Sequence, residues 1–363
     1  MIHYKIFESI DDQLIAEINR IKTLSFSYVF QQSEWVRTLV SFEKSLVKLK
    51  IVFIYKNHEI ILVAPMCIKS RYGCKELGWL TSDIIDYNGL IISKTFNFKD
   101  ILFIDLWKKI INSLSKECDL IFFNKIPELI ESSNNPIINS QYKFYQNSYQ
   151  LNLNDFEYNN FYNNKNNNKS IQTDRRKKKK LLDGDDLVCS HKEINLSNFE
   201  FIEELIFEKM SSYISKKEKT FNHEYLENQY REIVSRNSPN YKFNLSILKK
   251  NSVKISSIFG VIFNGIYYYL IPVTHNTEYK KLSPGRFHIM NLISWSIKNN
   301  IQSIDFTPGD ETYKISWSNN DFRMFYYIKP LSLKGMIRYI FLTFYYSLRQ
   351  NYFLKKIYRY IQI

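Results

Sequence analysis

The feature that most constrains the fold is a strand, loop, helix and second strand in the last third of the chain. Residues 265–273 (GIYYYLIPV) have the β-branched and aromatic composition of a strand. A basic loop leads from there into residues 283–285 (SPG), where a helical pattern begins, and a second short strand is expected at 303–306. Proline is favoured in the first turn of a helix, and the free backbone N–H groups that follow it can bind an anion. This helix start is therefore a predicted phosphate site.

The string from Lys254 to Trp317 resembles the acyl-CoA site of the GNAT acyltransferase superfamily. The pyrophosphate loop of that family reads Arg/Gln-x-x-Gly-x-Gly/Ala, and residues 280–285 (KKLSPG) share its basic first residue and its last glycine. SPG, an amphipathic helix, a strand ending in Asp and residues 309–314 (GDETYK) together resemble one branch of the superfamily. That branch holds double-domain GNAT proteins of polysaccharide and nucleotide-sugar biosynthesis, which are relatives of the Fem aminoacyltransferases.

The resemblance implies a mixed α/β fold of tandem GNAT-like domains, each a mostly antiparallel sheet flanked by helices. It also implies an enzyme that moves an acyl group from acyl-CoA to the amine of a nucleotide-linked amino sugar. Two alternatives stay open: a Fem-type transferase that uses aminoacyl-tRNA, and a non-catalytic GNAT-fold binding protein. The acyl group, the sugar and the choice between N- and O-acylation are left open as well.

The resemblance places the CoA site on the strand and the loop that follows it. Its predicted residues are Val273, Lys280, Lys281, Ser283, Gly285, Arg286 and Phe287. In the family the thioester lies along a splayed strand, and Pro272 removes a ladder donor as expected where two strands part. Val273 or Thr274 is then the expected donor to the thioester oxygen.

Catalysis also needs a proton acceptor for the amine and a proton donor for the leaving thiolate. Tyr313 stands where the family often places that donor, although a core tyrosine fits the pattern as well. The string 82–89 (SDIIDYNG) in the first half supplies polar groups for a sugar, although an Asn-Gly turn explains it too. The predicted catalytic residues are Asp86, Asp305 and Tyr313, and the predicted substrate ligands are Tyr87, Asn88, Asp310, Glu311 and Lys314. His275 and His288 are expected to be structural.

The chain reads as two halves with the same order of elements, which indicates a weak internal duplication. Only the second half carries the phosphate loop. We expect an N-terminal GNAT-like domain (1–153), an Asn-rich linker with a basic helix (154–185), a C-terminal GNAT domain with the acyl-CoA site (186–332) and a basic, aromatic helical tail (333–363).

Composition adds few functional constraints. The formal net charge of +14 accompanies only two alanines, Ala16 and Ala64, which is typical of an AT-rich coding sequence, so lysine is enriched partly by drift. The four cysteines show no metal-ligand spacing, so no metal is expected. The N-terminus lacks the order of a signal peptide, so the cytoplasm is the expected compartment. The cations at 175–180 are expected on a helix. The first expectation for them is a solvated face, the second is contact with a phosphate of CoA or a nucleotide, and the third is nucleic-acid binding. No nucleic-acid partner is expected.

The tail has its own pattern. If residues 333–361 form one helix, six cations share an arc of about 120°. These are Lys334, Arg338, Arg349, Lys355, Lys356 and Arg359. Such a face beside a broad aromatic one suits docking onto the protein body or peripheral contact with an anionic membrane.

Overall fold

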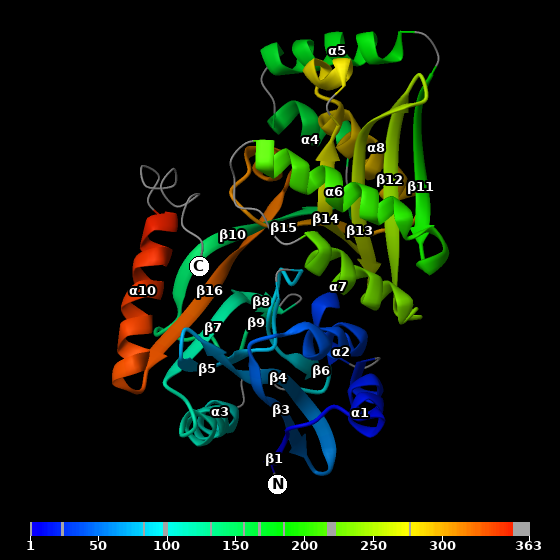
Figure 1. Ribbon diagram of the computed structural model, residues 1–363. Coiled ribbons are helices and arrows are strands. Elements are labelled where there is room, and N and C mark those ends of the chain that lie inside the picture. Colours follow the sequence, from blue (N-terminus) through cyan, green and yellow to red (C-terminus); the bar gives the residue numbers. More distant parts are fainter. Residues whose placement is uncertain are drawn as a thin grey trace. The chain divides into compact units, whose positions relative to one another are not determined.

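The computed structural model describes residues 2–22, 25–82, 84–96, 101–130, 133–154, 157–165, 168–183, 186–215, 223–275 and 277–350. It confirms the predicted mixed α/β class. The chain divides into two compact units: Met1–Asn147 with Phe322–Ile363 (unit 1), and Ser148–Asp321 (unit 2). The chain passes between them within β10 (Lys143–Asn152) and β16 (Asn320–Pro330) (Figure 1). The domain limits predicted at 153, 185 and 332 stay a prediction, and the last helix groups with unit 1.

Unit 1 contains a mixed sheet with the strand order β1-β3-β4-β5-β7-β16. Its elements are β1 (Ile2–Phe7), α1 (Asp12–Lys22), β2 (Ser25–Phe26), α2 (Ser33–Phe42), β3 (Leu46–Lys56), β4 (Glu59–Arg71), β5 (Cys74–Trp79), β6 (Ile91–Ser93), α3 (Ile101–Ser115), β7 (Leu120–Pro127), β8 (Leu129–Ile130), β9 (Ser133–Asn134) and α10 (Leu333–Gln350). Strand β5 pairs with β7 in parallel, and the helix between them is α3.

Unit 2 repeats this order. Its elements are α4 (Tyr158–Lys165), α5 (Asn168–Leu182), β11 (Leu187–Ile194), α6 (Glu200–Ser215), α7 (His223–Ser235), β12 (Tyr241–Lys250), β13 (Val253–Phe263), β14 (Ile266–Thr274), α8 (Pro284–Lys298), β15 (Ser303–Pro308) and α9 (Thr312–Trp317). In both units a strand and two helices precede three antiparallel strands, and one helix then leads to a parallel strand. The predicted internal duplication is therefore present in the order of the elements.

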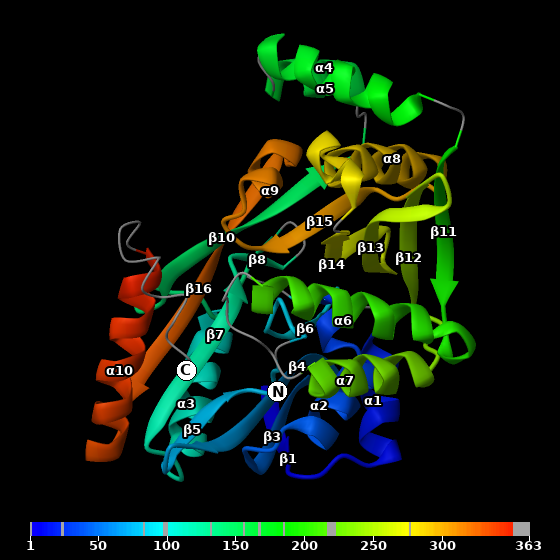
Figure 2. The ribbon, with the colours of Figure 1, turned by 45° about the horizontal axis from the view of Figure 1, so that its top comes forward.

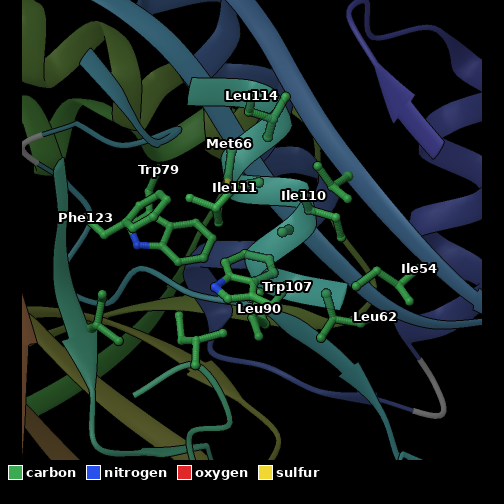
Figure 3. Packing of buried hydrophobic residues seen from close by; sticks show 14 of the residues in the cluster. Ile54, Leu62, Met66, Trp79, Leu90, Trp107, Ile110, Ile111, Leu114 and Phe123 are labelled. Carbon is green, nitrogen blue, oxygen red and sulfur yellow. The ribbon is translucent and has the colours of Figure 1, made fainter. Parts of the chain in front are cut away.

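The core of unit 1 forms where α3 packs against β4, β5 and β7. Trp107 of α3 stacks on Trp79 of β5 with ring centroids 6.4 Å apart, and Phe123 of β7 contacts the same ring (Figure 3). Strands β5 and β7 lie so close together here that a Cβ on Gly78 would meet the carbonyl oxygen of Phe122 at 2.6 Å. A glycine at this position permits that approach.

In unit 2 the two helical layers cover opposite faces of the sheet. Ser256 and Ser257 are neighbours on β13, so their side chains point to opposite faces. Ser256 contacts α8 through His288, and Ser257 contacts His275, which is bound to Glu208 of α6. Helix α8 therefore covers one face and α6 the other, as Figures 1 and 2 show.

Helix α10 docks onto the sheet of unit 1. The backbone approaches closely at Gly335, where a Cβ would meet the carbonyl oxygen of Asp119 at 1.8 Å. Arg338 donates from Nε to Glu76 at 2.7 Å, and both side chains are almost fully buried. Docking onto the protein body, one of the two roles expected of the tail, is therefore present for the described part of α10, and Arg338 of the predicted basic arc is buried in the docked side. The side chain of Arg349, together with Lys355, Lys356 and Arg359, lies outside the described residues.

Within the described ranges, no helix is long and apolar enough to cross a membrane.

Candidate functional site

The candidate site begins where two parallel strands part. Strand β14 pairs with β15 only from Ile266 to Tyr268, and beyond that point it remains paired with β13 alone. The register between β13 and β14 shifts next to this point, with Leu270 as the extra residue. Pro272 follows in β14, as the sequence predicts for a strand at a parting point.

A groove of about 1240 Å³ lies along this free part of β14. It is lined on one side by the strand, on another by α6, and at one end by the start of α8. The lining residues are Glu204, Phe207, Glu208, Lys209, Ser211, Val253, Lys254, Tyr269, Pro272, Val273, Thr274, His275, Thr277, Lys280, Ser283, Gly285, Arg286, Ile289, Tyr313 and Trp317. All of them belong to unit 2, and we call this cavity the donor groove.

The start of α8 carries a cluster of cations. Ser283 caps the helix in a left-handed conformation (φ 58°), and Pro284 occupies the first turn. Lys177, which the sequence placed in the basic helix, donates from Nζ to Ser283 Oγ at 2.7 Å. Arg286 donates a hydrogen bond from Nε to the carboxylate of Asp174 at 2.6 Å, and its guanidinium lies over the Trp317 ring. The positive helix end and these side chains together favour an anion.

The backbone direction of β14 separates the two predicted oxyanion donors. The backbone N–H of His275 donates to the carbonyl of Ile255 in β13. The carbonyl of Val273 accepts a hydrogen bond from the hydroxyl of Ser256, which is also in β13. Since backbone groups alternate along a strand, the N–H of Thr274 points away from β13, toward the free edge. Lys209 of α6 already donates to the carbonyl of Pro272 on that edge, at 2.9 Å. Thr274 is therefore better directed than Val273.

The remaining predicted donor-site residues lie apart from the groove wall. Phe287 is 3% exposed and packs in a core cluster with Leu181, Leu248 and Ile255. Lys281 is exposed on the turn Glu278–Leu282 that precedes the helix. Their side chains therefore do not line the described groove.

Of the predicted catalytic residues, Tyr313 lines the groove. It belongs to α9, and its ring lies 6.1 Å from that of Tyr269 and 6.4 Å from that of Phe306. Asp305 is buried, and its Oδ1 accepts the N–H of Thr307 at 2.7 Å, which is a turn cap of the kind the sequence also allowed.

Helix α9, which follows the loop after β15, holds its lysine inward. Lys314 is 5% exposed, and its Nζ donates to the carbonyl of Pro308 at 2.9 Å. It also pairs with Glu311 at 3.3 Å. Asp310 and Glu311 are exposed and, like Lys314, are not among the groove-lining residues.

The string around residue 86 lies in unit 1. Tyr87 is fully buried among the rings of Tyr28, Phe30 and Phe322. The amide of Asn88 donates to both oxygens of Asn124, from Nδ2 at 3.1 Å in each case. Asp86 is half-buried between these elements. The predicted convergence of Asp86 with residues 310–314 stays a prediction.

Sequence reasoning missed a chain of three polar groups on the groove wall. Glu208 contacts Nδ1 of His275 at 2.9 Å, and Nε2 of His275 contacts Ser257 Oγ at 2.8 Å. A carboxylate, an imidazole and a hydroxyl are thus connected, with Glu208 and His275 lining the groove. No local signal reveals it, because the three residues come from α6, β13 and the end of β14.

His288 has the structural role that the sequence predicted. Its Nε2 lies 2.7 Å from Ser246 Oγ and its Nδ1 lies 2.9 Å from Ser256 Oγ, in a fully buried position. Burial, and next the charges of His191 and His275, lower the pKa of His288 to about 3. The ring is therefore neutral at any physiological pH.

Across the described segments, His, Cys, Asp and Glu form no cluster that could hold a metal ion.

Residues 168–315 match the profile of a protein family described as an acetyltransferase (GNAT) domain. The match begins in α5 and ends in α9, so it covers the elements that line the donor groove. No protein with a curated description matches the sequence.

Three solved structures are similar over most of their length. The crystal structure of FemX has a TM-score of 0.58 at 10% identity, with 90% of this chain and 97% of that chain covered. A tandem GNAT protein from the clavulanic acid biosynthesis pathway has a TM-score of 0.51 at 8% identity, with 91% and 98% covered. L-PGS from Bacillus licheniformis has a TM-score of 0.51 at 10% identity, with 93% and 97% covered. Such low identities establish the fold alone, and they confirm the predicted tandem GNAT-like architecture.

Proposed function

We propose that this protein is an acyl-CoA-dependent N-acyltransferase whose donor lies in the donor groove. The observation that carries the proposal is the parting of β14 from β15 beside the cationic start of α8. The free strand edge offers backbone groups to an extended pantetheine arm, and the helix start offers N–H groups to its pyrophosphate. The match of residues 168–315 to a GNAT domain supports this assignment.

The groove supplies groups for each step of acyl transfer. The N–H of Thr274 is directed to stabilise the oxyanion that forms when the amine adds to the thioester carbonyl. Glu208, a groove-lining carboxylate backed by His275, can take the proton that the amine loses. The C–N bond forms, the C–S bond breaks, and Tyr313 supplies a proton to the leaving thiolate. Asp86 and Asp305, the two carboxylates expected from the sequence as bases, lie outside the groove lining.

For the acceptor we propose the amine of a nucleotide-linked amino sugar, used in cytoplasmic biosynthesis of a surface polysaccharide. This part rests on the sequence resemblance, with Asp310, Glu311 and Lys314 of unit 2 as its proposed ligands. N-acylation is proposed over O-acylation on the ground of the same resemblance.

A second candidate, a Fem-type transferase that uses aminoacyl-tRNA, is favoured by one observation. Helix α5 docks beside the start of α8 through its buried residues Ile171, Asp174 and Leu181 (Figure 2). Its opposite side exposes Arg175, Arg176, Lys179 and Lys180. Exposed cations next to the donor groove suit the phosphodiester backbone of a tRNA as well as a single CoA.

Calorimetric titration with CoA tests the donor assignment. In Gly285→Val the new Cβ lies 3.0 Å from Thr274 Oγ1 and the methyl groups enter the mouth of the groove, so we expect CoA affinity to fall more than tenfold. Ser294→Val places the same residue at an exposed position of α8 and serves as the matched control. Equal CoA affinity in wild type and Gly285→Val would rule out the groove as the CoA site.

A wild-type protein that binds no CoA thioester, yet releases tRNA from aminoacyl-tRNA when amino-sugar nucleotides are added, would support the second candidate. Its turnover should then fall with Arg176→Ala and with rising salt. Thiol release from acetyl-CoA in the presence of the same acceptors supports the first.

A further inference from the structure

The outward side of α10 is apolar and exposed. Six large hydrophobic residues on this helix have exposed fractions between 44% and 87%, and we call them the outer face of α10. They are Leu333, Met336, Ile337, Ile340, Phe341 and Phe344. A contiguous apolar patch of this kind is uncommon on a protein surface that contacts only water.

These residues share one side of the helix. At 100° per residue, positions 333, 337, 340 and 344 fall within an arc of about 60°, and positions 336 and 341 widen it to about 140°. The spacing is that of an amphipathic helix whose apolar stripe meets a second surface. Yet the stripe is turned away from the protein's own core, which is the unusual part.

The rotation of α10 about its axis is fixed by its inner side. Gly335 lies against the backbone of Asp119, and Arg338 forms a buried ion pair with Glu76. The Tyr346 ring stacks on that of Tyr326 with centroids 4.2 Å apart. Turning the outer face inward would break the ion pair and expose these rings, so the apolar stripe stays outside.

The charge of the surrounding sequence indicates what covers this face. Residues 322–363 contain no Asp or Glu. Arg323 and Arg338 pair with Glu128 and Glu76, and the segment adds Lys329, Lys334, Arg349, Lys355, Lys356 and Arg359. Lys334 is exposed at the edge of the stripe. A second copy would bring two such cationic segments together, and their repulsion opposes self-association. A negatively charged surface with an apolar interior matches both the apolar outer face of α10 and the positive charge around it.

We propose that the outer face of α10 binds the surface of an anionic lipid bilayer, with its apolar side chains between the headgroups and the basic residues near lipid phosphates. Docking on the body and contact with a membrane, which the sequence presented as alternatives, then belong to opposite sides of one helix. An apolar face flanked by cations lies in the plane of the interface and does not cross it. The proposal does not depend on the identity of the acyl donor or acceptor.

Vesicle flotation tests it with the full chain and two lipid compositions, phosphatidylcholine alone and phosphatidylcholine with 30% phosphatidylglycerol. We expect wild type to bind the anionic vesicles at least tenfold more tightly than the neutral ones. Raising salt should weaken binding, because screening reduces attraction to the headgroups. Binding to neither vesicle, or equal salt-insensitive binding to both, would overturn the proposal.

Variants locate the surface. Ile337→Asp with Ile340→Asp should reduce anionic-vesicle binding at least tenfold, and the milder Ile337→Ser should reduce it measurably. Ile104→Asp is the matched control, because Ile104 is 46% exposed on α3 of the same unit and lies outside the stripe. Binding equal to wild type in the double variant would overturn the assignment to α10. A lipid-free dimer in sedimentation velocity that the double variant dissociates would overturn it in favour of a second copy.

Discussion

The buried His288 makes the stability of unit 2 depend on pH in a predictable direction. Its ring lies between Ser246 and Ser256 and is fully buried. Because Ser256 donates its only hydroxyl proton to the carbonyl of Val273, it accepts from Nδ1–H of His288, and Nε2 accepts from Ser246. Neutral imidazole satisfies this network, and burial lowers the pKa of the ring to about 3.

The sign follows from which state binds more protons. An unfolded histidine titrates near its ordinary pKa of about 6.5, whereas folded His288 stays neutral down to about pH 3. The unfolded state therefore gains a proton as pH falls through 6.5, and folding loses stability from there toward pH 3. Between pH 7.5 and pH 5.0 this linkage lowers the free energy of unfolding by about 2 kcal/mol.

Urea denaturation at several pH values, followed by tryptophan fluorescence, measures the effect in wild type and His288→Gln. Glutamine can donate and accept like the neutral ring but does not titrate, and all other groups contribute equally to both proteins. The stability advantage of wild type over the variant should therefore shrink by about 2 kcal/mol between pH 7.5 and 5.0. His223→Gln, at the exposed start of α7, serves as the control and should follow wild type. A wild-type advantage that does not change with pH would refute the reasoning.

Three further outcomes follow from the contacts described above. Arg338→Met should lower the unfolding free energy of unit 1 by about 3 kcal/mol in urea, and adding Glu76→Leu should restore most of it, because the single change leaves a buried charge unpaired. Lys177→Ala should weaken CoA binding about tenfold by calorimetry, while Lys179→Ala on the exposed side of the same helix should not; equal effects would remove Lys177 from the donor site. Tyr313→Phe should lower kcat about 10²-fold with unchanged CoA affinity, and an unchanged kcat would exclude it as the proton donor.

The donor groove was predictable to the extent that it is local in sequence. Proline within an apolar strand, a basic loop and SPG before a helical pattern are signals that all lie within residues 265–285, and the structure places them as expected around Pro272, Ser283 and Gly285. The same signals could not separate Val273 from Thr274. That distinction depends on which neighbouring strand receives each backbone group, and the bulge at Leu270 alters the alternation.

The contacts that join distant segments could not be predicted. Glu208 reaches His275 because α6 packs against β14. Lys177 reaches Ser283 because α5 packs against the turn that precedes α8. The tail shows a related limit, since periodicity alone placed its cations on one arc of the helix. Periodicity gives the arc that Arg338 occupies but not the side on which the helix docks, and the buried partner Glu76 lies 262 residues away.

The contact between Lys209 and Pro272 has a consequence for how the chain avoids aggregation. Where β14 leaves β15, its edge is unpaired, and an unpaired strand edge is a template on which another extended chain can add. Pro272 has no N–H to offer such a chain, and its carbonyl already accepts a hydrogen bond from Lys209 at 2.9 Å. The middle of the free edge is thereby closed to intermolecular strand pairing. The strand keeps an edge open for a small extended ligand while a continuous ladder with a second protein cannot form there.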